Sequence, residues 1–277
     1  MDRLPEGCIS EMLSLTSPAD VCRSSLVSNL FKSAADSDLL WEKFLPVDYQ
    51  HIISRAFYPL LSVTTLSKKE LYNRLCDDQL LIDGGFKSFQ LEKCSGKICT
   101  MLGAKELAIA WGDDPYHWNW RSYPGSRFAE VAELDWVCWL EIRGKLETRL
   151  LSPNTFYAAY LVLKLEHPYG LDNEAIKAKV EVVGGNSSAC SEERAIYLHA
   201  RGEHSSSDAM LEGQYFARER GDGWMEVEMG HFYNKLGGGE INEGGGEVRM
   251  SVLEIERGRC KTGLIVQGME VRPMPET

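Results

Sequence analysis

Large aromatic side chains and two carboxylates share one short stretch of the sequence. It contains Trp111, Asp113, Asp114, Tyr116, Trp118 and Trp120. The stretch is rich in turn-forming residues and should lie at the surface, where large aromatic side chains are unusual unless they bind something. An aromatic ring can stack on the apolar face of a sugar, while carboxylates bind the hydroxyl groups at its edge. These residue types favour a carbohydrate-binding site; the alternative is that the tryptophans pack the loop.

The sequence lacks the usual signatures of catalysis and of metal binding. Its six histidines form no H-x-x-x-H pattern, and no G-x-S-x-G nucleophile elbow occurs. The eight cysteines include no C-x-x-C pair, so we expect free thiols, no bound metal and no cofactor. Asp113 and Asp114 are adjacent and their side chains diverge, whereas a glycosidase needs two carboxylates roughly 5–9.5 Å apart. We therefore expect a binding protein and not an enzyme.

Composition and charge narrow the choice of partners. Of the 277 residues, 44% are hydrophobic and 26% are charged, which is typical of a folded protein. The 41 acidic and 30 basic residues give a net charge of −11, which disfavours nucleic acid and anionic membranes as partners. The sequence has no apolar run long enough for a membrane span and no pattern of a secretory signal. We expect a protein that is not secreted and lies in the cytoplasm or the nucleus.

The elements that would position these residues change character along the chain. Up to about residue 45, apolar residues recur at helical spacing, and three short helices are expected to begin near Glu6, Pro18 and Asp36. From about residue 88 the period becomes two, which is typical of β-strands. Strands are expected around 107–111, 134–142, 155–165, 179–183, 195–200, 224–231, 247–255 and 263–271. The order predicts an α+β chain, in which a three-helix module precedes an antiparallel β-sandwich of the jelly-roll type.

Two further tryptophans fall within the strand expected at 134–142. Trp136 shares a face with Leu134 and Ile142, so the pattern places its ring in the core. Trp139 lies three residues further and points to the opposite face, and the pattern does not decide between packing and binding there.

Apolar and turn-forming residues near the N-terminus match a known docking module. The matching stretches include Leu4-Pro5-Glu6, Pro18-Ala19-Asp20-Val21, Leu26-Val27-Ser28 and Asp38-Leu39-Leu40-Trp41. They resemble an F-box, which in its family binds the adaptor subunit of Skp–cullin–F-box ubiquitin ligases. The resemblance implies an exposed apolar strip that contacts the adaptor through Leu4, Pro5, Ile9, Leu13, Val21, Leu26, Val27 and Trp41. The alternative is an ordinary helical subdomain packed on the sandwich.

The remainder of the chain matches a second family. The stretches Ile109-Ala110-Trp111-Gly112-Asp113-Asp114-Pro115, Val137-Cys138-Trp139-Leu140-Glu141 and Gly268-Met269-Glu270-Val271-Arg272 are among those that carry the match. They resemble the phloem-protein-2-like lectins of plants, the Nictaba group, whose fold is a jelly-roll sandwich. In that family two tryptophans seven residues apart form the sugar platform, and they correspond to Trp111 and Trp118. The implied ligands are glycans or glycoproteins that contain N-acetylglucosamine or mannose.

Together the two resemblances predict the organisation and function of the chain. We expect an F-box at 1–48, a helical connector at 49–87 and a lectin-like sandwich at 88–277. The predicted function is substrate recognition in a Skp–cullin–F-box ubiquitin ligase, with catalysis in the partner subunits. Two alternatives stay open: an intracellular lectin with no ligase role, or an F-box adaptor whose sandwich recognises a protein surface.

Overall fold

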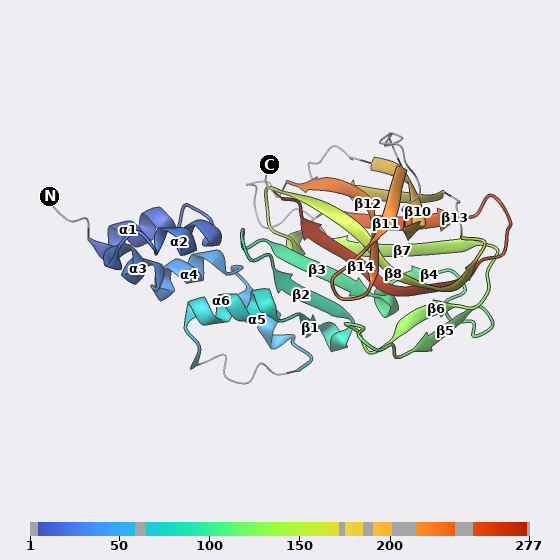
Figure 1. The fold of residues 1–277 in the computed structure, drawn as a ribbon, viewed down its shortest axis with the longest axis horizontal. Helices are drawn as coiled ribbons and strands as arrows, with labels where there is room; N and C mark the ends of the chain where they lie inside the picture. The colour runs from blue at the N-terminus through green and yellow to red at the C-terminus, as the bar shows by residue number, and fades with distance from the viewer. Residues whose placement is uncertain are drawn as a thin grey trace. The chain divides into compact units, whose positions relative to one another are not determined.

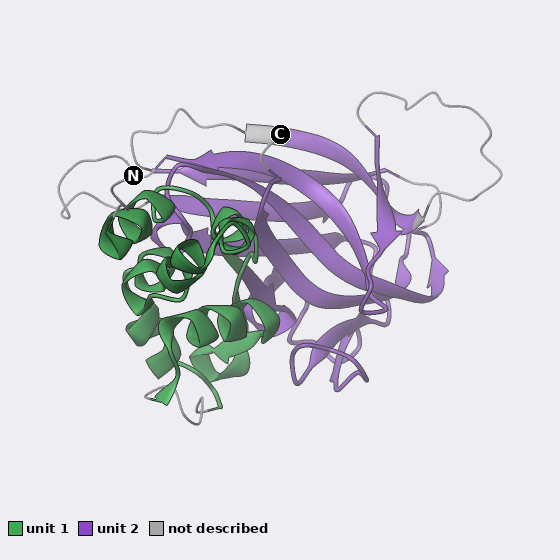
Figure 2. Ribbon diagram, turned by 60° about the vertical axis from the view of Figure 1, so that its left-hand side comes forward, with its two compact units in different colours: residues 1–99 green, residues 100–277 purple. Residues whose placement is uncertain are grey.

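The chain forms helices at its N-terminal end and mainly antiparallel β-structure beyond them (Figure 1). The computed structural model describes residues 5–58, 65–171, 175–184, 191–200, 214–235 and 246–275. They divide into two compact units, residues 1–99 and residues 100–277 (Figure 2). The expected fold class is therefore confirmed. Within the described ranges, no helix has the length and apolar character needed to cross a membrane.

Unit 1 begins with four short helices where the sequence pattern predicted three. Its elements are α1 (Glu6–Leu13), α2 (Pro18–Ser24), α3 (Asn29–Ala35), α4 (Asp38–Phe44), α5 (Tyr49–Ser54), α6 (Lys68–Asp77), β1 (Leu80–Ile82) and β2 (Lys87–Leu91). The start of α2 is as expected, because Ser17 accepts a hydrogen bond from the Asp20 backbone and Pro18 occupies the first turn. The additional helix α3 arises because Ser28 caps a separate start by accepting a hydrogen bond from the Phe31 backbone.

The helices of unit 1 enclose a core of their own. Trp41 of α4 is 1% exposed, and its ring lies 5.0 Å from the ring of Tyr72 in α6. The indole Nε1 of Trp41 donates a hydrogen bond to the Ala35 carbonyl at 2.6 Å, so its one polar atom is satisfied inside the core. Helix α6 starts with a capping box between Ser67 and Glu70, which fixes the end of the helix next to this core.

Unit 2 consists of two sheets, which we call sheet A and sheet B. Sheet A contains β3 (Ile98–Gly103), β14 (Thr262–Pro273), β8 (Thr155–Tyr169), β12 (Met225–Asn234) and β11 (Gln214–Glu219), with β6 (Val131–Leu134) paired to β14 and β5 (Trp118–Arg121) paired to β6. Sheet B contains β10 (Ser191–Ala200), β9 (Ile176–Val183), β13 (Glu247–Glu254), β7 (Leu140–Glu147) and β4 (Ala108–Ile109). The parallel pair β10–β11 joins the sheets; the other pairs between these strands are antiparallel.

One hydrophobic core lies between the two sheets. Leu161 and Met269 of sheet A and Ile142 and Val252 of sheet B all belong to it and are fully buried. In β7, buried residues alternate with residues outside the core, as the period of two predicted.

The prediction of a single strand at 134–142 is wrong. Strand β6 ends at Leu134 and belongs to sheet A, whereas β7 begins at Leu140 and belongs to sheet B. Residues 135–139 form the connection between the sheets. An alternating pattern can therefore continue across two separate strands, because the chain leaves one sheet and enters the other after only five residues.

The face of sheet A that points away from the core carries buried charges. Glu270 bonds Arg127 at 3.1 Å and Arg220 at 2.5 Å, and Glu226 bonds Arg272. Burial alone would raise the pKa of Glu270, but Arg127 and Arg220 hold it below its usual value. Burial would also raise the pKa of Glu226, but the hydrogen bond from Arg272 lowers it, and the pKa again lies below its usual value. Both carboxylates therefore contribute to stability as paired anions.

Candidate functional site

Trp118 is buried and holds the backbone of the loop that follows β4. The expectation that its ring lies exposed in this loop is wrong: Trp118 is the first residue of β5 and only 2% exposed. Strand β5 pairs with β6, with Trp118 opposite Leu134, and this pairing places the indole in the core. Its Nε1 donates a hydrogen bond to the Ala110 carbonyl at 3.1 Å. Trp118 therefore fixes the loop backbone beside Trp111.

Trp120 holds the next residue of the same loop. It is half-buried against the core, and its Nε1 donates a hydrogen bond to the Gly112 carbonyl at 2.8 Å. The ammonium group of Lys105 lies 3.9 Å from the centre of its ring, a cation–π contact. Trp118 and Trp120 thus bind the carbonyls on the two sides of Trp111.

Trp111 is exposed and its backbone conformation is unusual. Its side chain is 58% exposed, and its φ of 63° lies in the left-handed region, which residues other than glycine rarely adopt. Gly112 follows because a Cβ there would lie 3.0 Å from the Ile109 carbonyl oxygen. Strained backbone of this kind is concentrated at functional sites, where the surrounding structure keeps it in place.

Trp111, His117 and Trp136 form a row of neighbouring rings, which we call the aromatic cluster. The ring centres of Trp111 and His117 are 5.7 Å apart, and those of His117 and Trp136 are 5.8 Å apart with nearly parallel planes. The expectation that Trp136 lies in the core is wrong, since 48% of its surface is exposed. Its position in the connection from β6 to β7 brings it to the loop, where its backbone N–H donates to the His117 carbonyl.

Polar groups surround the aromatic cluster. Asp113 and Tyr116 are exposed, whereas one Asp114 oxygen accepts a hydrogen bond from the Tyr116 backbone at 2.9 Å. The other Asp114 oxygen lies 3.8 Å from Nε2 of His117. The loop therefore combines exposed aromatic surface with carboxylates and a phenol, residue types that suit a sugar ring.

Comparison with the expected site shows what the sequence pattern missed. In the structure Trp111, Asp113 and Tyr116 are exposed on the loop and Asp114 is half-buried, whereas Trp118 and Trp120 support the loop backbone. His117 and Trp136 were not among the predicted site residues. His117 lies within the predicted loop and could have been found there. Trp136 could not, because the misassigned strand placed it in the core.

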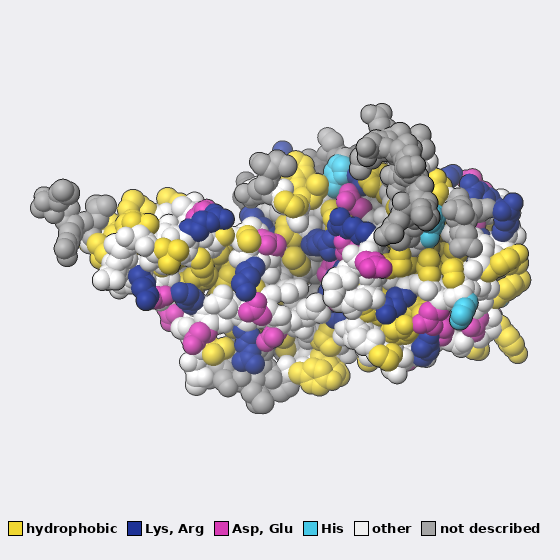
Figure 3. Space-filling view, in the orientation of Figure 1, with side chains coloured by type: hydrophobic (Ala, Val, Ile, Leu, Met, Phe, Trp, Pro, Cys, Tyr) yellow, Lys and Arg dark blue, Asp and Glu magenta, His cyan; other side chains and the backbone are white. Residues whose placement is uncertain are grey.

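Some of the residues predicted to bind the ligase adaptor are exposed and others are buried. Leu26 and Val27, in the turn between α2 and α3, are 86% and 71% exposed, and Pro5 is exposed before α1. Figure 3 shows apolar side chains gathered on the visible surface of these helices. Further exposed apolar residues not predicted here are Met12, Leu15 and Leu39. Leu4 lies outside the described residues.

The expectation that all the predicted adaptor residues form an exposed strip is wrong. Ile9, Leu13, Val21 and Trp41 are buried in the core of unit 1. The physical reason is that α6 and the strands β1 and β2 complete this core, so these four side chains already have partners within unit 1.

Comparison with known proteins assigns the chain to a family. Residues 97–273 match the family described as "Phloem protein 2", and residues 1–43 match the family described as "F-box domain". This chain belongs to the phloem protein 2 family. It is 46% identical to F-box protein PP2-B10 of Arabidopsis thaliana over 98% of this chain and 93% of the relative. It is 39% identical to F-box protein VBF of Arabidopsis thaliana, with 99% of both chains covered. The predicted resemblance to F-box proteins of the phloem-protein-2 type is therefore confirmed.

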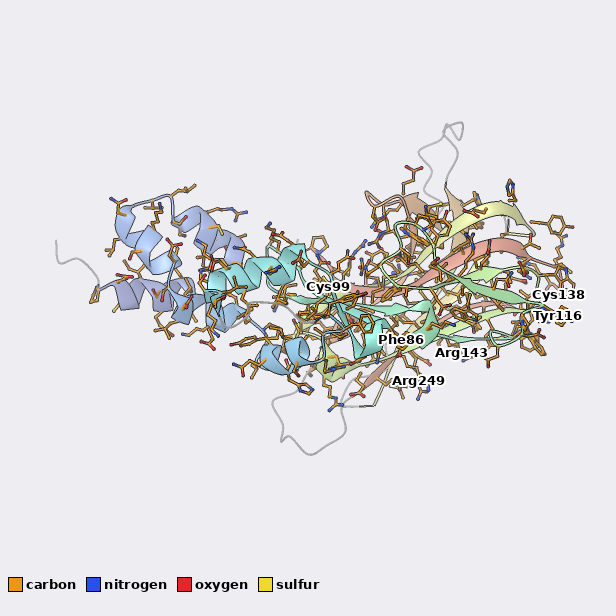
Figure 4. All side chains as sticks on the ribbon, turned by 90° about the horizontal axis from the view of Figure 1, so that it is seen from below. Phe86, Cys99, Tyr116, Cys138, Arg143 and Arg249 are labelled. Atoms are coloured by element: carbon orange, nitrogen blue, oxygen red, sulfur yellow. The ribbon has the colours of Figure 1, made fainter. Side chains whose placement is uncertain are left out.

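The phloem protein 2 domain carries a second feature, a groove on the exposed face of sheet B. Its volume is about 460 Å³. It is lined by Arg143, Gly144, Lys145, Lys179, Glu181, Arg249, Met250 and Ser251. The strand register places Lys145 directly opposite Arg249, and Figure 4 labels Arg143 and Arg249 on these neighbouring strands. Like charges opposite each other destabilise a sheet unless anions lie near them. Glu181, opposite Arg249, and Glu247, bonded to it at 2.6 Å, supply part of that charge.

Proposed function

We propose that this F-box phloem protein 2 chain is the substrate-recognition subunit of a Skp–cullin–F-box ubiquitin ligase. The F-box would bind the Skp-type adaptor, and catalysis would reside in partner subunits. Two observations support the first step: the match of residues 1–43 to the F-box, and the exposure of Leu26 and Val27 in the turn between α2 and α3. Exposed apolar side chains of this kind are common in protein interfaces.

The ligand of the phloem protein 2 domain would be a glycan or a glycoprotein that contains N-acetylglucosamine or mannose. The aromatic cluster carries this proposal, because it exposes Trp111 and Trp136 on the two sides of His117, in a loop that also exposes Asp113 and Tyr116. In this proposal Trp111 takes the place in the sugar platform that the sequence predicted, while Trp136, and not the buried Trp118, is its partner.

The adaptor interaction is tested by co-purification of the full chain with a Skp-type adaptor. Leu26→Asp should weaken adaptor binding at least tenfold, which corresponds to about 1.4 kcal/mol. Tyr58→Asp is the matched control, because Tyr58 is also an exposed residue of unit 1 but lies beyond the F-box match. If the Leu26 variant binds the adaptor as the wild type does, this docking surface is wrong. A wild-type chain that binds no adaptor would leave the lectin without a ligase role.

Glycan binding is tested on a glycan array and then by titration with the best oligosaccharide. Affinity for a single site should be in the millimolar to micromolar range, about −4 to −8 kcal/mol. Trp111→Ala should weaken binding more than tenfold and leave circular dichroism unchanged. Phe156→Ala is the control, since Phe156 is 59% exposed at the start of β8 and is not part of the aromatic cluster. Equal binding by the Trp111 variant and the wild type would contradict the proposed platform.

A second candidate is recognition of an acidic protein surface by the groove of sheet B. The positive charges of Arg143, Lys145 and Arg249 favour such a client, in a chain whose net charge is −11. Arg143 and Arg249 also pair with Glu141 and Glu247. The double variant Lys145→Glu, Arg249→Glu should then bind less of the client protein, while its binding on the glycan array should equal that of the wild type. If capture follows Trp111 instead, the glycan site is the one that selects the client.

A further inference from the structure

Two cysteines far apart in the sequence meet at the same end of unit 2 as the aromatic cluster. The sulfur atoms of Cys138 and Cys260 are 2.8 Å apart, although 122 positions separate the residues. Cys138 lies in the connection from β6 to β7, and Cys260 lies just before β14. Both side chains are half-buried, so a small solute can reach them. Figure 4 labels Cys138 and Tyr116 at this end of unit 2.

Backbone hydrogen bonds between the neighbouring residues Val137 and Lys261 hold the two thiols in position. Val137 and Lys261 exchange both of their backbone hydrogen bonds, at 3.1 Å and 2.7 Å. The adjacent pair, Cys138 and Cys260, therefore occupies a position without hydrogen bonds, where Cα atoms of antiparallel strands are about 4.5 Å apart and the side chains are closest. That separation lies within the range that a disulfide bond requires. The bond can form without movement of the backbone.

Further contacts restrict each segment. Lys261 is fully buried, and its ammonium group donates hydrogen bonds to the carbonyls of Cys138 at 3.1 Å and Arg259 at 2.8 Å. It also forms an ion pair with Glu254. On the other side, Gly170 packs against the Cys260 carbonyl so closely that a Cβ would collide with it. The two thiols are thus fixed relative to each other by contacts that do not involve sulfur.

We propose that Cys138 and Cys260 are a redox pair that peroxide converts into a reversible intrachain disulfide. The thiolate of one cysteine attacks hydrogen peroxide, takes one oxygen as a sulfenic acid and releases water. The second thiol then attacks that sulfur, the S–S bond forms and a second water leaves. In total the two thiols lose two electrons and two protons, and the peroxide becomes two molecules of water. A dithiol restores the reduced form by exchange.

The bond would join the connection between β6 and β7 to the segment before β14. Residues 135–139 also carry Trp136, so oxidation restricts the backbone beside the aromatic cluster. The neighbouring Cys260 thiol raises the pKa of Cys138, while Lys261 opposes this effect. Because the thiolate is the form that attacks peroxide, the raised pKa should make oxidation slow at neutral pH and faster as the pH rises. The proposal does not depend on the identity of the ligand.

The test uses the full chain, reduced and then treated with hydrogen peroxide, with the remaining thiols alkylated before peptide mapping. We expect a linked peptide that contains Cys138 and Cys260, an intact mass lower by two hydrogen atoms, and recovery of both thiols with dithiothreitol. The linked peptide should be absent in Cys138→Ser and Cys260→Ser. It should be unchanged in Cys94→Ser, which removes an exposed thiol elsewhere. If both cysteines remain alkylated at a dose that oxidises Cys94, the proposal is overturned.

Thermal unfolding of the wild type provides a measurement that needs no variant to fold. Oxidation should raise the unfolding midpoint, because the bond restricts the unfolded chain, and dithiothreitol should reverse the rise. Cys260→Ala should show no rise. A midpoint that falls or stays unchanged, in protein shown by mass to be oxidised at these two residues, would mean that the native positions do not favour the bond.

Discussion

The loop after β4 and the helices of unit 1 differ in structure, but they share one property. In each region, some of the residues that match the family are exposed and others are buried. In the loop, Trp111 is exposed and Trp118 is buried. In the helices, Leu26 is exposed and Trp41 is buried. A sequence match marks both groups alike, since both are needed for the site. It does not tell which residues contact a partner and which hold those residues in place.

The two regions differ in how the buried group does its work. In the loop, Trp118 and Trp120 donate hydrogen bonds to backbone carbonyls next to Trp111 and so fix a strained turn. In the helices, Trp41 mainly packs against apolar neighbours and bonds a carbonyl of its own helical module. Loss of Trp118 or Trp120 should therefore change both the stability of the fold and the position of the Trp111 ring.

The largest expected effect separates the two tryptophans of the loop. Trp118→Ala should lower the free energy of unfolding by about 3–5 kcal/mol, as is usual when a fully buried tryptophan is removed. Trp111→Ala removes a side chain that is mostly exposed and should cost less than about 1 kcal/mol. Chemical denaturation of both variants measures the difference. Equal losses would contradict the division into support and contact.

A somewhat smaller effect is expected where charges act as supports. Glu270→Gln removes the buried carboxylate that pairs with Arg127 and Arg220, and the free energy of unfolding should fall by about 3 kcal/mol, although Arg220 keeps its ion pair with Glu226. Glu247→Gln removes one exposed ion pair and should cost at most about 1 kcal/mol.

The pH dependence of stability tests the two buried carboxylates of sheet A, Glu270 and Glu226. The pKa of Glu270 and of Glu226 is lower in the folded chain than the ordinary value of 4.5. Their stabilisation is therefore present above 4.5 and is lost as the pH falls through the lowered folded pKa. The acid side of the stability profile should be steep in the wild type and shallower in Glu270→Gln. Identical slopes would show that Glu270 is not a paired anion.

The smallest expected effect concerns a single hydrogen bond. Trp120→Phe keeps an aromatic ring but removes the donor to the Gly112 carbonyl, and should cost about 1 kcal/mol of stability. Because that carbonyl belongs to the residue after Trp111, glycan affinity should also fall, by a few-fold. Unchanged affinity with reduced stability would mean that Trp118 alone positions the Trp111 ring.

Much of the fold could be predicted from hydrophobic periodicity. The long strands β8, β12, β13 and β14 were expected at nearly their observed positions. Strand β13 alternates between core and surface, whereas β8 is marked by its run of aromatic and branched residues, most of which are buried. The additional helix α3 was missed, because only the short turn of residues 25–28, which ends in the capping Ser28, separates it from α2. The predicted boundaries at 48 and 87 stay predictions.

The site was less predictable for a physical reason. Trp118 looked like a loop residue because β5 has only four residues, and its pairing with β6 is not visible in local sequence. The contact between Cys138 and Cys260 joins positions 122 residues apart, beyond the reach of any local pattern. Trp111 could be assigned to the surface because Gly112 and Pro115 mark the turn that carries it.

The left-handed backbone at Trp111 has a kinetic consequence. A non-glycine residue in this conformation costs on the order of 1–3 kcal/mol, and the contacts of Trp118 and Trp120 meet that cost when the chain folds. For the proposed glycan ligand, the backbone that carries the Trp111 ring is then already in place, and binding needs no slow ordering of this turn. Association should be fast, and differences in affinity between ligands should be found mainly in how quickly each one leaves.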